Sequence, residues 1–214
     1  MNFGVLVFDQ VEELAFVGPW TMLTRWSKLE NGPKNCLIVG QSVGPMTCAN
    51  GLSINPHVSF ADCPWLDYLL VPGGQGTRQE VRNSVLIDFV ANQAKTCTAV
   101  LAVCTGAFVL HTAGLLSGRK ATTHCCSLDR LRALGDITVI EDRYVQDGNV
   151  WTSAGVSAGI DLMLAFIASV AGEGAAGKAQ FGSEYYPSLV KYGGFESHAK
   201  APAYLNGLDP KRYK

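Results

Sequence analysis

Four short apolar runs, separated by segments with helical spacing, constrain the fold of this chain most. The runs lie at residues 3–9, 35–41, 65–74 and 97–103. Each is almost continuously apolar rather than alternating, which is typical of strands buried on both faces of a parallel sheet. Helical segments follow at residues 11–26 and 81–95. The alternation predicts a doubly wound α/β fold, with a mostly parallel sheet sandwiched between helices.

The remaining segments fit the same architecture. Residues 46–60 carry Asn50-Gly51 between two alternating stretches, which predicts a hairpin outside the main sheet. Residues 119–124 and 137–155 supply further strands, the latter with a turn at Asp147-Gly148, and residues 157–172 form a long closing helix. Because no repeat or linker interrupts the pattern, we expect a single domain over residues 1–214.

Composition excludes several functional classes. The 214 residues are 48% hydrophobic and 16% charged, with a formal net charge of -1 and no block of Lys and Arg. A nucleic-acid surface is therefore not expected, and no helix-turn-helix segment follows residue 183. The N-terminus has neither a leader pattern nor a long apolar stretch, so we expect a cytoplasmic protein without membrane contact.

The seven cysteines do not have the pattern of a disulfide framework. They are odd in number and scattered, which argues against disulfides. No CxxC pair exists, and His124 is followed directly by Cys125 and Cys126. We expect these adjacent cysteines to have difficulty placing both sulfurs on one tetrahedral ion, so no metal site is predicted.

The segment Ala99–Leu110 (AVLAVCTGAFVL) is the strongest chemical signal. Its apolar run stops at Cys104 and reopens as an amphipathic pattern, which predicts a strand, a sharp turn and a helix. A cysteine at a helix N-terminus meets unpaired N–H groups and the positive end of the helix dipole, which favour a thiolate. We expect Cys104 to be a nucleophile with a pKa of about 5 to 7. The alternative is a small buried apolar residue.

Three further positions accompany this elbow. Gly74 follows Gly73 in a Pro-Gly-Gly turn. The backbone amides of Gly74 and Thr105 could stabilise a developing negative charge, and the alternative is a simple tight turn. Thr105 could also cap the helix or hydrogen-bond the sulfur. His124 either polarises the thiol or is merely hydrogen-bonded in a loop. Because Thr, not His, follows Cys104, a Cys-His amide hydrolase is less expected.

The motifs VFDQVEELAFVGPW, LLVPGG, AVCTGAFVLHTAGLLSGRKATTH and SAGVSAGID, in this order, resemble the ThiJ/PfpI superfamily of class I glutamine-amidotransferase-like proteins. Within it, the chain is most similar to the isonitrile hydratase group. The resemblance implies a flavodoxin-like fold, a homodimer and no cofactor. It also implies that Cys104 is the nucleophile, Thr105 its neighbour and Gly74 an oxyanion-hole donor, with Gly73 and His124 close to the sulfur.

One position departs from the family pattern. The family places Asp or Glu four residues before the Pro of a Gly-Pro pair, and this chain has Ala15 there. The missing carboxylate is expected to hydrogen-bond the thiolate and to act as general acid. We therefore expect impaired activity with an intact fold. The nearby Glu12 and Glu13 are interpreted as a solvated first helical turn rather than as catalytic acids.

The resemblance leads to one main functional hypothesis and two alternatives. The main hypothesis is hydration of an isonitrile, a small molecule, to an N-substituted formamide through a cysteine thioimidate. The first alternative is a glyoxalase or deglycase that acts on methylglyoxal-type aldehydes. The second is a non-enzymatic redox sensor that is oxidised at the same cysteine.

Overall fold

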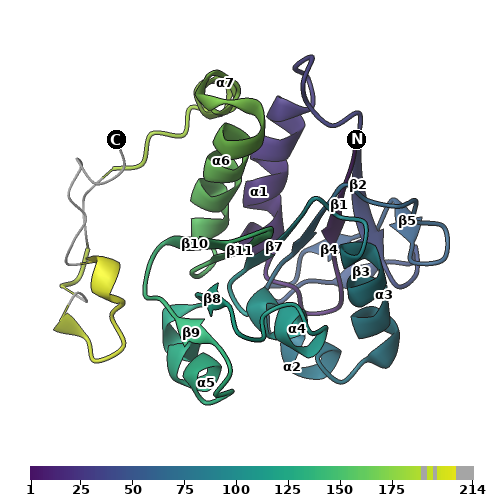
Figure 1. The fold of residues 1–214 in the computed structure, drawn as a ribbon. Coiled ribbons are helices and arrows are strands. Elements are labelled where there is room, and N and C mark those ends of the chain that lie inside the picture. The colour runs from purple at the N-terminus through teal and green to yellow at the C-terminus, as the bar shows by residue number, and fades with distance from the viewer. Residues whose placement is uncertain (189–191, 195–196, 206–214) are drawn as a thin grey trace.

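A seven-stranded sheet forms the centre of the molecule (Figure 1). The computed structural model describes residues 1–188, 192–194 and 197–205. The strand order is β10-β11-β7-β6-β1-β2-β5, and all neighbours are parallel except β10 and β11. The strands are β1 (Asn2–Leu6), β2 (Asn35–Gly40), β5 (Val58–Ser59), β6 (Tyr68–Val71), β7 (Ala99–Val103), β10 (Tyr144–Asp147) and β11 (Val150–Ser153). The predicted mostly parallel sheet is confirmed.

Helices cover both faces of this sheet (Figure 1). One layer contains α1 (Glu13–Trp26), α6 (Ala158–Ala171) and α7 (Glu173–Gly182). The other contains α2 (Thr77–Glu80), α3 (Ser84–Ala94) and α4 (Gly106–Thr112). The connection from β1 to β2 runs toward the β5 edge of the sheet, whereas the connection from β6 to β7 runs toward the β10 edge. Because both crossovers are right-handed, the helix of the first connection and the helices of the second lie on opposite faces.

Phe166 of α6 ties the helical layer to the sheet. Its ring packs edge-on against Tyr68, Trp151, Phe3 and Trp26, with centroid distances of 5.1, 5.7, 6.2 and 6.2 Å. All five side chains are buried. Aromatic pairs of this geometry contribute about 0.5–1.5 kcal/mol each beyond their buried area. The aromatic cluster therefore fixes α6 and α1 across three strands of the sheet.

Two excursions leave the main sheet. The first is the antiparallel hairpin of β3 (Met46–Thr47) and β4 (Ser53–Ile54) around Asn50-Gly51, which confirms the predicted hairpin. The second joins β8 (Lys120–Ala121) in parallel to β9 (Thr138–Val139). Between them lie the 3-10 turn η1 (Cys125–Ser127) and α5 (Leu128–Arg132). A last 3-10 turn, η3, spans Ala203–Leu205.

Some elements differ from the sequence-based expectation. Residues 119–124 pair over only two residues and stay outside the main sheet. The helices α2, α5 and α7 were not predicted, because α2 and α5 are too short for a periodic pattern and α7 buries only Ala175 and Ala179. None of the helices in the described ranges is long and apolar enough to cross a bilayer.

Candidate active site

Cys104 occupies the sharp turn between β7 and α4, as predicted. Its φ of 58° lies in the left-handed region, which costs a residue with a side chain about 1–3 kcal/mol and is often found at functional sites. Neighbouring strands hold this conformation. The Cys104 amide lies 3.1 Å from both the Ser153 and the Ala154 carbonyl oxygens, and Thr123 Oγ1 donates to the Cys104 carbonyl at 2.8 Å. The sequence therefore folds into a strained elbow that is fixed on both sides.

Two glycines let the elbow approach its neighbours closely. A Cβ atom on Gly73 would lie 2.6 Å from Thr105 N and 2.8 Å from Cys104 Cβ. A Cβ atom on Gly106 would lie 2.2 Å from the Val71 carbonyl oxygen. Side chains at these two positions would displace the backbone. Gly73 thus lies directly beside Cys104.

Thr105 connects the elbow to the Gly73-Gly74 turn. Its Oγ1 accepts a hydrogen bond from the Gly74 amide at 3.0 Å. The Thr77 hydroxyl lies 3.0 Å from the same oxygen and donates to the Gly74 carbonyl at 2.7 Å. Thr105 stands at the N-cap of α4 but makes no side-chain capping bond, so the capping interpretation is wrong. The Gly74 amide is already occupied by a protein acceptor.

The expectation of a low pKa for Cys104 is wrong for this structure. The residue is only 6% exposed, and burial raises the pKa of its thiol. Backbone hydrogen bonds from Thr105 and Val156 and the Thr105 hydroxyl act in the opposite direction, whereas the charge of Glu12 raises the pKa further. Desolvation of the anion therefore outweighs the dipole of a seven-residue helix.

Glu12 is a site residue that the sequence analysis undervalued. Its amide donates to the Gly73 carbonyl at 2.9 Å, and Val11 forms a β-bridge with Gly74, so the start of α1 is attached to the turn over Cys104. Its carboxylate accepts a hydrogen bond from Asn50 Nδ2 at 3.3 Å. Its charge raises the pKa of Cys104. A carboxylate whose charge acts on a thiol can also move protons.

Ala15 lies in the first turn of α1, just after Glu12. It is fully buried, and its amide donates to the Glu12 carbonyl at 3.1 Å. Glu13, by contrast, binds the hairpin, accepting from the Asn50 amide at 2.8 Å. Of the two neighbouring glutamates, only Glu12 acts on Cys104 in this structure.

His124 is held as a structural residue of a turn. Its Nδ1 accepts a hydrogen bond from the Cys126 amide at 3.1 Å and so caps η1. A Cβ atom on Gly155 would lie 2.3 Å from its Cδ2, so the ring packs directly on the backbone there. Burial lowers the pKa of His124, although the charge of Glu12 raises it. The loop interpretation therefore describes this histidine better than a Cys-His dyad.

Comparison with known proteins identifies the family of this chain. A model of the DJ-1/PfpI family matches residues 2–169. The chain belongs to the DJ-1/PfpI family.

Two sequence relatives and one solved structure extend this result. The chain is 38% identical to an isonitrile hydratase from Pseudomonas putida over 188 residues, covering 88% of this chain and 80% of the relative. It is 24% identical to a deglycase from Pyrococcus abyssi over 158 residues, covering 73% and 90%. The crystal structure of a ThiJ/PfpI family protein from Pseudomonas syringae superposes with a TM-score of 0.83 at 34% identity, covering 96% and 83%. The flavodoxin-like fold expected from the resemblance is confirmed.

Arg130 is a second site residue that the sequence analysis missed. Its guanidinium carbon lies 3.7 Å from the ring centre of Phe108, which stands in α4 one turn after Cys104. Its charge interacts favourably with a Cys104 thiolate and unfavourably with Arg78 of α2. No sequence signal identified Arg130, because its helix α5 has only five residues. The family's elbow is therefore flanked by a carboxylate and a guanidinium in this chain.

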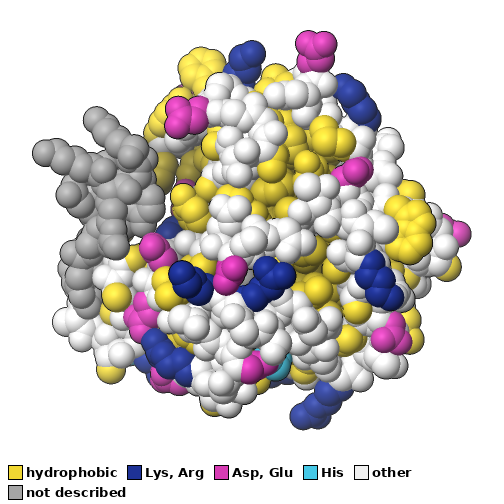
Figure 2. All heavy atoms as spheres, in the orientation of Figure 1, with side chains coloured by type: hydrophobic (Ala, Val, Ile, Leu, Met, Phe, Trp, Pro, Cys, Tyr) yellow, Lys and Arg dark blue, Asp and Glu magenta, His cyan; other side chains and the backbone are white. Residues whose placement is uncertain are grey.

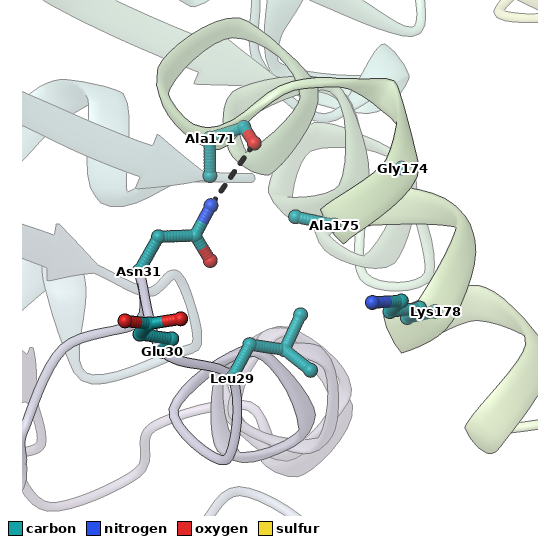
Figure 3. Close-up of a pocket in the computed structure, with 7 residues that line it drawn as sticks. All are labelled: Leu29, Glu30, Asn31, Ala171, Gly174, Ala175 and Lys178. Atoms are coloured by element: carbon teal, nitrogen blue, oxygen red, sulfur yellow. Dashed lines mark hydrogen bonds between the residues drawn. The ribbon is translucent and has the colours of Figure 1, made fainter.

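A cavity of about 620 Å³ is lined by residues far in sequence from Cys104 (Figure 3). It opens between the loop after α1 and the α6–α7 junction, where Asn31 Nδ2 donates to the Ala171 carbonyl at 3.2 Å. Its ionisable lining residues are Glu30 and Lys178, and Cys104 does not line it. This cavity lacks a nucleophile and is not the family's active site.

Proposed function

We propose that this DJ-1/PfpI family chain hydrates isonitriles, small molecules, to N-substituted formamides, with Cys104 as the nucleophile. The observation that carries the proposal is the strained, buried Cys104 beneath the Gly73-Gly74 turn. Such strain persists where the surrounding structure enforces it, and it presents the sulfur at the end of a strand. The 38% identity to an isonitrile hydratase over most of both chains supports the substrate class.

The reaction needs two nucleophilic additions to the same carbon, first by the sulfur and then by water. It also needs three proton transfers: the thiol proton goes to that carbon, and the two water protons go to the nitrogen and to the leaving sulfur. The Cys104 sulfur attacks the terminal isonitrile carbon, which forms a C–S bond and leaves an electron pair on that carbon. A proton added there gives a thioimidate. Water then adds to the same carbon, the nitrogen gains a proton, and cleavage of the C–S bond releases the formamide and restores the thiol.

The raised pKa of Cys104 gives Glu12 a role in this sequence. The resting sulfur carries its proton, which must leave before attack. We assign the Glu12 carboxylate as the acceptor, which then returns the proton to the substrate carbon. Because Glu12 is also tied to Asn50, it serves less well than an acid at position 15. The activity is therefore impaired relative to relatives with the usual carboxylate.

The developing charge explains the use of Gly74. Attack on an isonitrile places charge on carbon, so no oxyanion forms in the first step. The Gly74 amide instead holds the Thr105 hydroxyl, which lowers the pKa of Cys104. We therefore assign Gly74 as a positioning residue for Thr105 in the first step, and as an oxyanion donor only when water adds.

A homodimer accompanies this proposal. Leu14 and Val17 of α1 are 40% and 38% exposed, and Val170 of α6 is 41% exposed. Figure 2 shows hydrophobic side chains gathered on the face that carries α1. Exposed apolar patches of this kind mark contact surfaces. Analytical ultracentrifugation should give a dimer for the wild type and a monomer for the Leu14→Lys, Val17→Lys variant, and a monomeric wild type would overturn this part.

Turnover tests the proposal directly. The reduced protein is incubated with a panel of alkyl and aryl isonitriles, and formamide is quantified by chromatography. Formamide should appear with the wild type and not with Cys104→Ala. Absence of formamide across the panel, with both the wild type and Ala15→Asp, would overturn the proposed activity.

Similarity to a deglycase favours one alternative activity. The same sulfur could add to the aldehyde of methylglyoxal. The hemithioacetal would rearrange by a proton shift to a lactoyl thioester, and water would then cleave the C–S bond to release lactate and the thiol. An enzymatic lactate assay with methylglyoxal separates this reaction from isonitrile hydration. If neither substrate turns over while peroxide oxidises Cys104, the redox-sensor alternative gains support.

A further inference from the structure

Three consecutive side chains beside the elbow bring their ligand atoms together. His124, Cys125 and Cys126 each offer one such atom, and all three atoms lie within 4.8 Å of one another. Cys125 Sγ is 3.8 Å from His124 Nδ1 and 3.9 Å from Cys126 Sγ. The proposed hydration uses neither cysteine.

Two of the three separations, from Cys125 Sγ to His124 Nδ1 and to Cys126 Sγ, are close to those around a tetrahedral metal ion. Metal–sulfur bonds of about 2.3 Å and metal–nitrogen bonds of about 2.0 Å put two sulfurs about 3.8 Å apart and a sulfur and a nitrogen about 3.5 Å apart. The measured values of 3.9 and 3.8 Å differ by a few tenths of an ångström. The sequence predicted that adjacent cysteines have difficulty placing both sulfurs on one ion. In the structure both lie in the single turn η1, with their sulfurs 3.9 Å apart.

The histidine is prepared for coordination. Since Nδ1 accepts a hydrogen bond from the Cys126 amide, this nitrogen carries the lone pair and the proton is on Nε2. The ring already packs against the Gly155 backbone, because a Cβ atom added to Gly155 would lie only 2.3 Å from His124 Cδ2. The ring therefore cannot move further toward Gly155. A bound ion would take the lone pair in place of the amide. The cluster is also accessible, since Cys126 is exposed and the other two side chains are half-buried.

We propose that His124, Cys125 and Cys126 bind one thiophilic d10 cation, Zn²⁺ or Cu⁺, through an imidazole and two thiolates. Thiolates select these ions over Mg²⁺ or Ca²⁺, and imidazole suits both. Binding replaces the two thiol protons, which are released to solvent. Three protein ligands complete a trigonal Cu⁺ site or leave the fourth position of Zn²⁺ to water.

The site adjoins the nucleophile without including it. Thr123, directly before His124, donates its hydroxyl to the Cys104 carbonyl. A cation here would therefore stiffen the segment that holds the elbow. The inference does not depend on the reaction that Cys104 catalyses.

Metal competition tests the site. The reduced, metal-free protein is titrated with Zn²⁺ against a chromophoric chelator, and anaerobically with Cu⁺ against a Cu⁺-specific chelator, with Mg²⁺ as a hard-ion control. We expect one equivalent of Zn²⁺ or Cu⁺ and no Mg²⁺. The arm with tighter binding identifies the ion. Co²⁺ should add a sulfur-to-cobalt charge-transfer band, which reports thiolate ligation directly.

Variants separate this site from other thiols. Cys125→Ser, Cys126→Ser and His124→Gln should each weaken binding by more than about tenfold, since loss of an outer-shell partner alone costs about 10–100-fold. Cys104→Ser and the distant Cys63→Ser should bind as the wild type does, and circular dichroism checks the fold of each variant. Unchanged binding in Cys125→Ser or His124→Gln, loss of binding in Cys104→Ser, or no binding at all would overturn the proposal.

Discussion

The Thr105 hydroxyl accepts a hydrogen bond from the Gly74 amide at 3.0 Å, so the residue after Cys104 holds the Gly73-Gly74 turn in place. The same hydroxyl lowers the pKa of Cys104, against the larger effect of burial. One side chain therefore controls both the position of the turn and the ionisation of the sulfur.

Replacement of Thr105 tests this double role. Thr105→Val keeps the shape but removes the hydroxyl, so formamide production should fall by up to about tenfold, the equivalent of one hydrogen bond. Thr105→Ser should retain most of the rate. The pH profile of Cys104 alkylation should move to higher pH in Thr105→Val only. Equal profiles in the two variants would contradict the role of the hydroxyl.

Replacement of Cys104 should separate folding from activity. Cys104→Ser and Cys104→Ala should unfold at nearly the wild-type temperature, because the backbone amide of residue 104 holds the elbow by donating to the Ser153 and Ala154 carbonyl oxygens. Both should lose turnover, since a hydroxyl at its ordinary pKa does not replace the sulfur. Thermal unfolding and formamide formation are measured side by side. Retention of about a tenth of the rate or more would exclude a nucleophilic role.

Glu12→Gln should change thiol reactivity and turnover in opposite directions. The Glu12 charge raises the pKa of Cys104, so its removal lowers this pKa and increases the thiolate fraction at neutral pH. Alkylation by iodoacetamide, followed at Cys104 by mass spectrometry from pH 6 to 10, should therefore be faster, whereas formamide production should fall. Glu13→Gln is the matched control, because Glu13 binds the same Asn50. Identical behaviour of the two variants would remove the special role of Glu12.

Ala15→Asp should restore the usual acid of the family. We expect the hydration rate to rise by about two to four orders of magnitude, the range for a positioned general acid. Ala15→Asn has nearly the same shape without the acid and should give no gain. Rates are compared at saturating isonitrile. Equal rates for Ala15 and Ala15→Asp would show that position 15 does not face the reacting carbon.

Arg130 should bias the site toward anions. Iodoacetate and iodoacetamide have nearly the same shape but differ in charge, so their rate ratio at Cys104 reports the local field. Arg130→Gln should lower the ratio for iodoacetate over iodoacetamide. Arg132→Gln is the control, because Arg132 pairs with Asp129 and Glu141 and its charge is already neutralised. A ratio that is insensitive to Arg130 would contradict this assignment.

The sequence predicted the elements that repeat a strong local pattern. The turn at Cys104 was predicted correctly. An apolar run followed at once by a helical pattern requires a strand that passes directly into a helix. The hairpin at Asn50-Gly51 followed from its turn residues in the same way. Both features depend on short-range geometry that neighbouring residues determine.

The features that were missed depend on distant contacts. Arg130 reaches Phe108 from a five-residue helix with no periodic signal. Glu12 was read as a solvated residue, since its attachment to Gly73 joins segments about sixty residues apart. The pKa of Cys104 was misjudged because the dipole of a helix is visible in the sequence, whereas the burial of its first turn is not.

The absence of side chains at Gly73, Gly106 and Gly155 has an evolutionary consequence. Each glycine meets a neighbour so closely that one added carbon would collide with the backbone or with the His124 ring. A single substitution at one of these positions therefore displaces neighbouring atoms and does not make a small change in the surroundings of Cys104. Changes of substrate preference during divergence are therefore expected at other side chains that act on Cys104, such as Glu12 and Arg130.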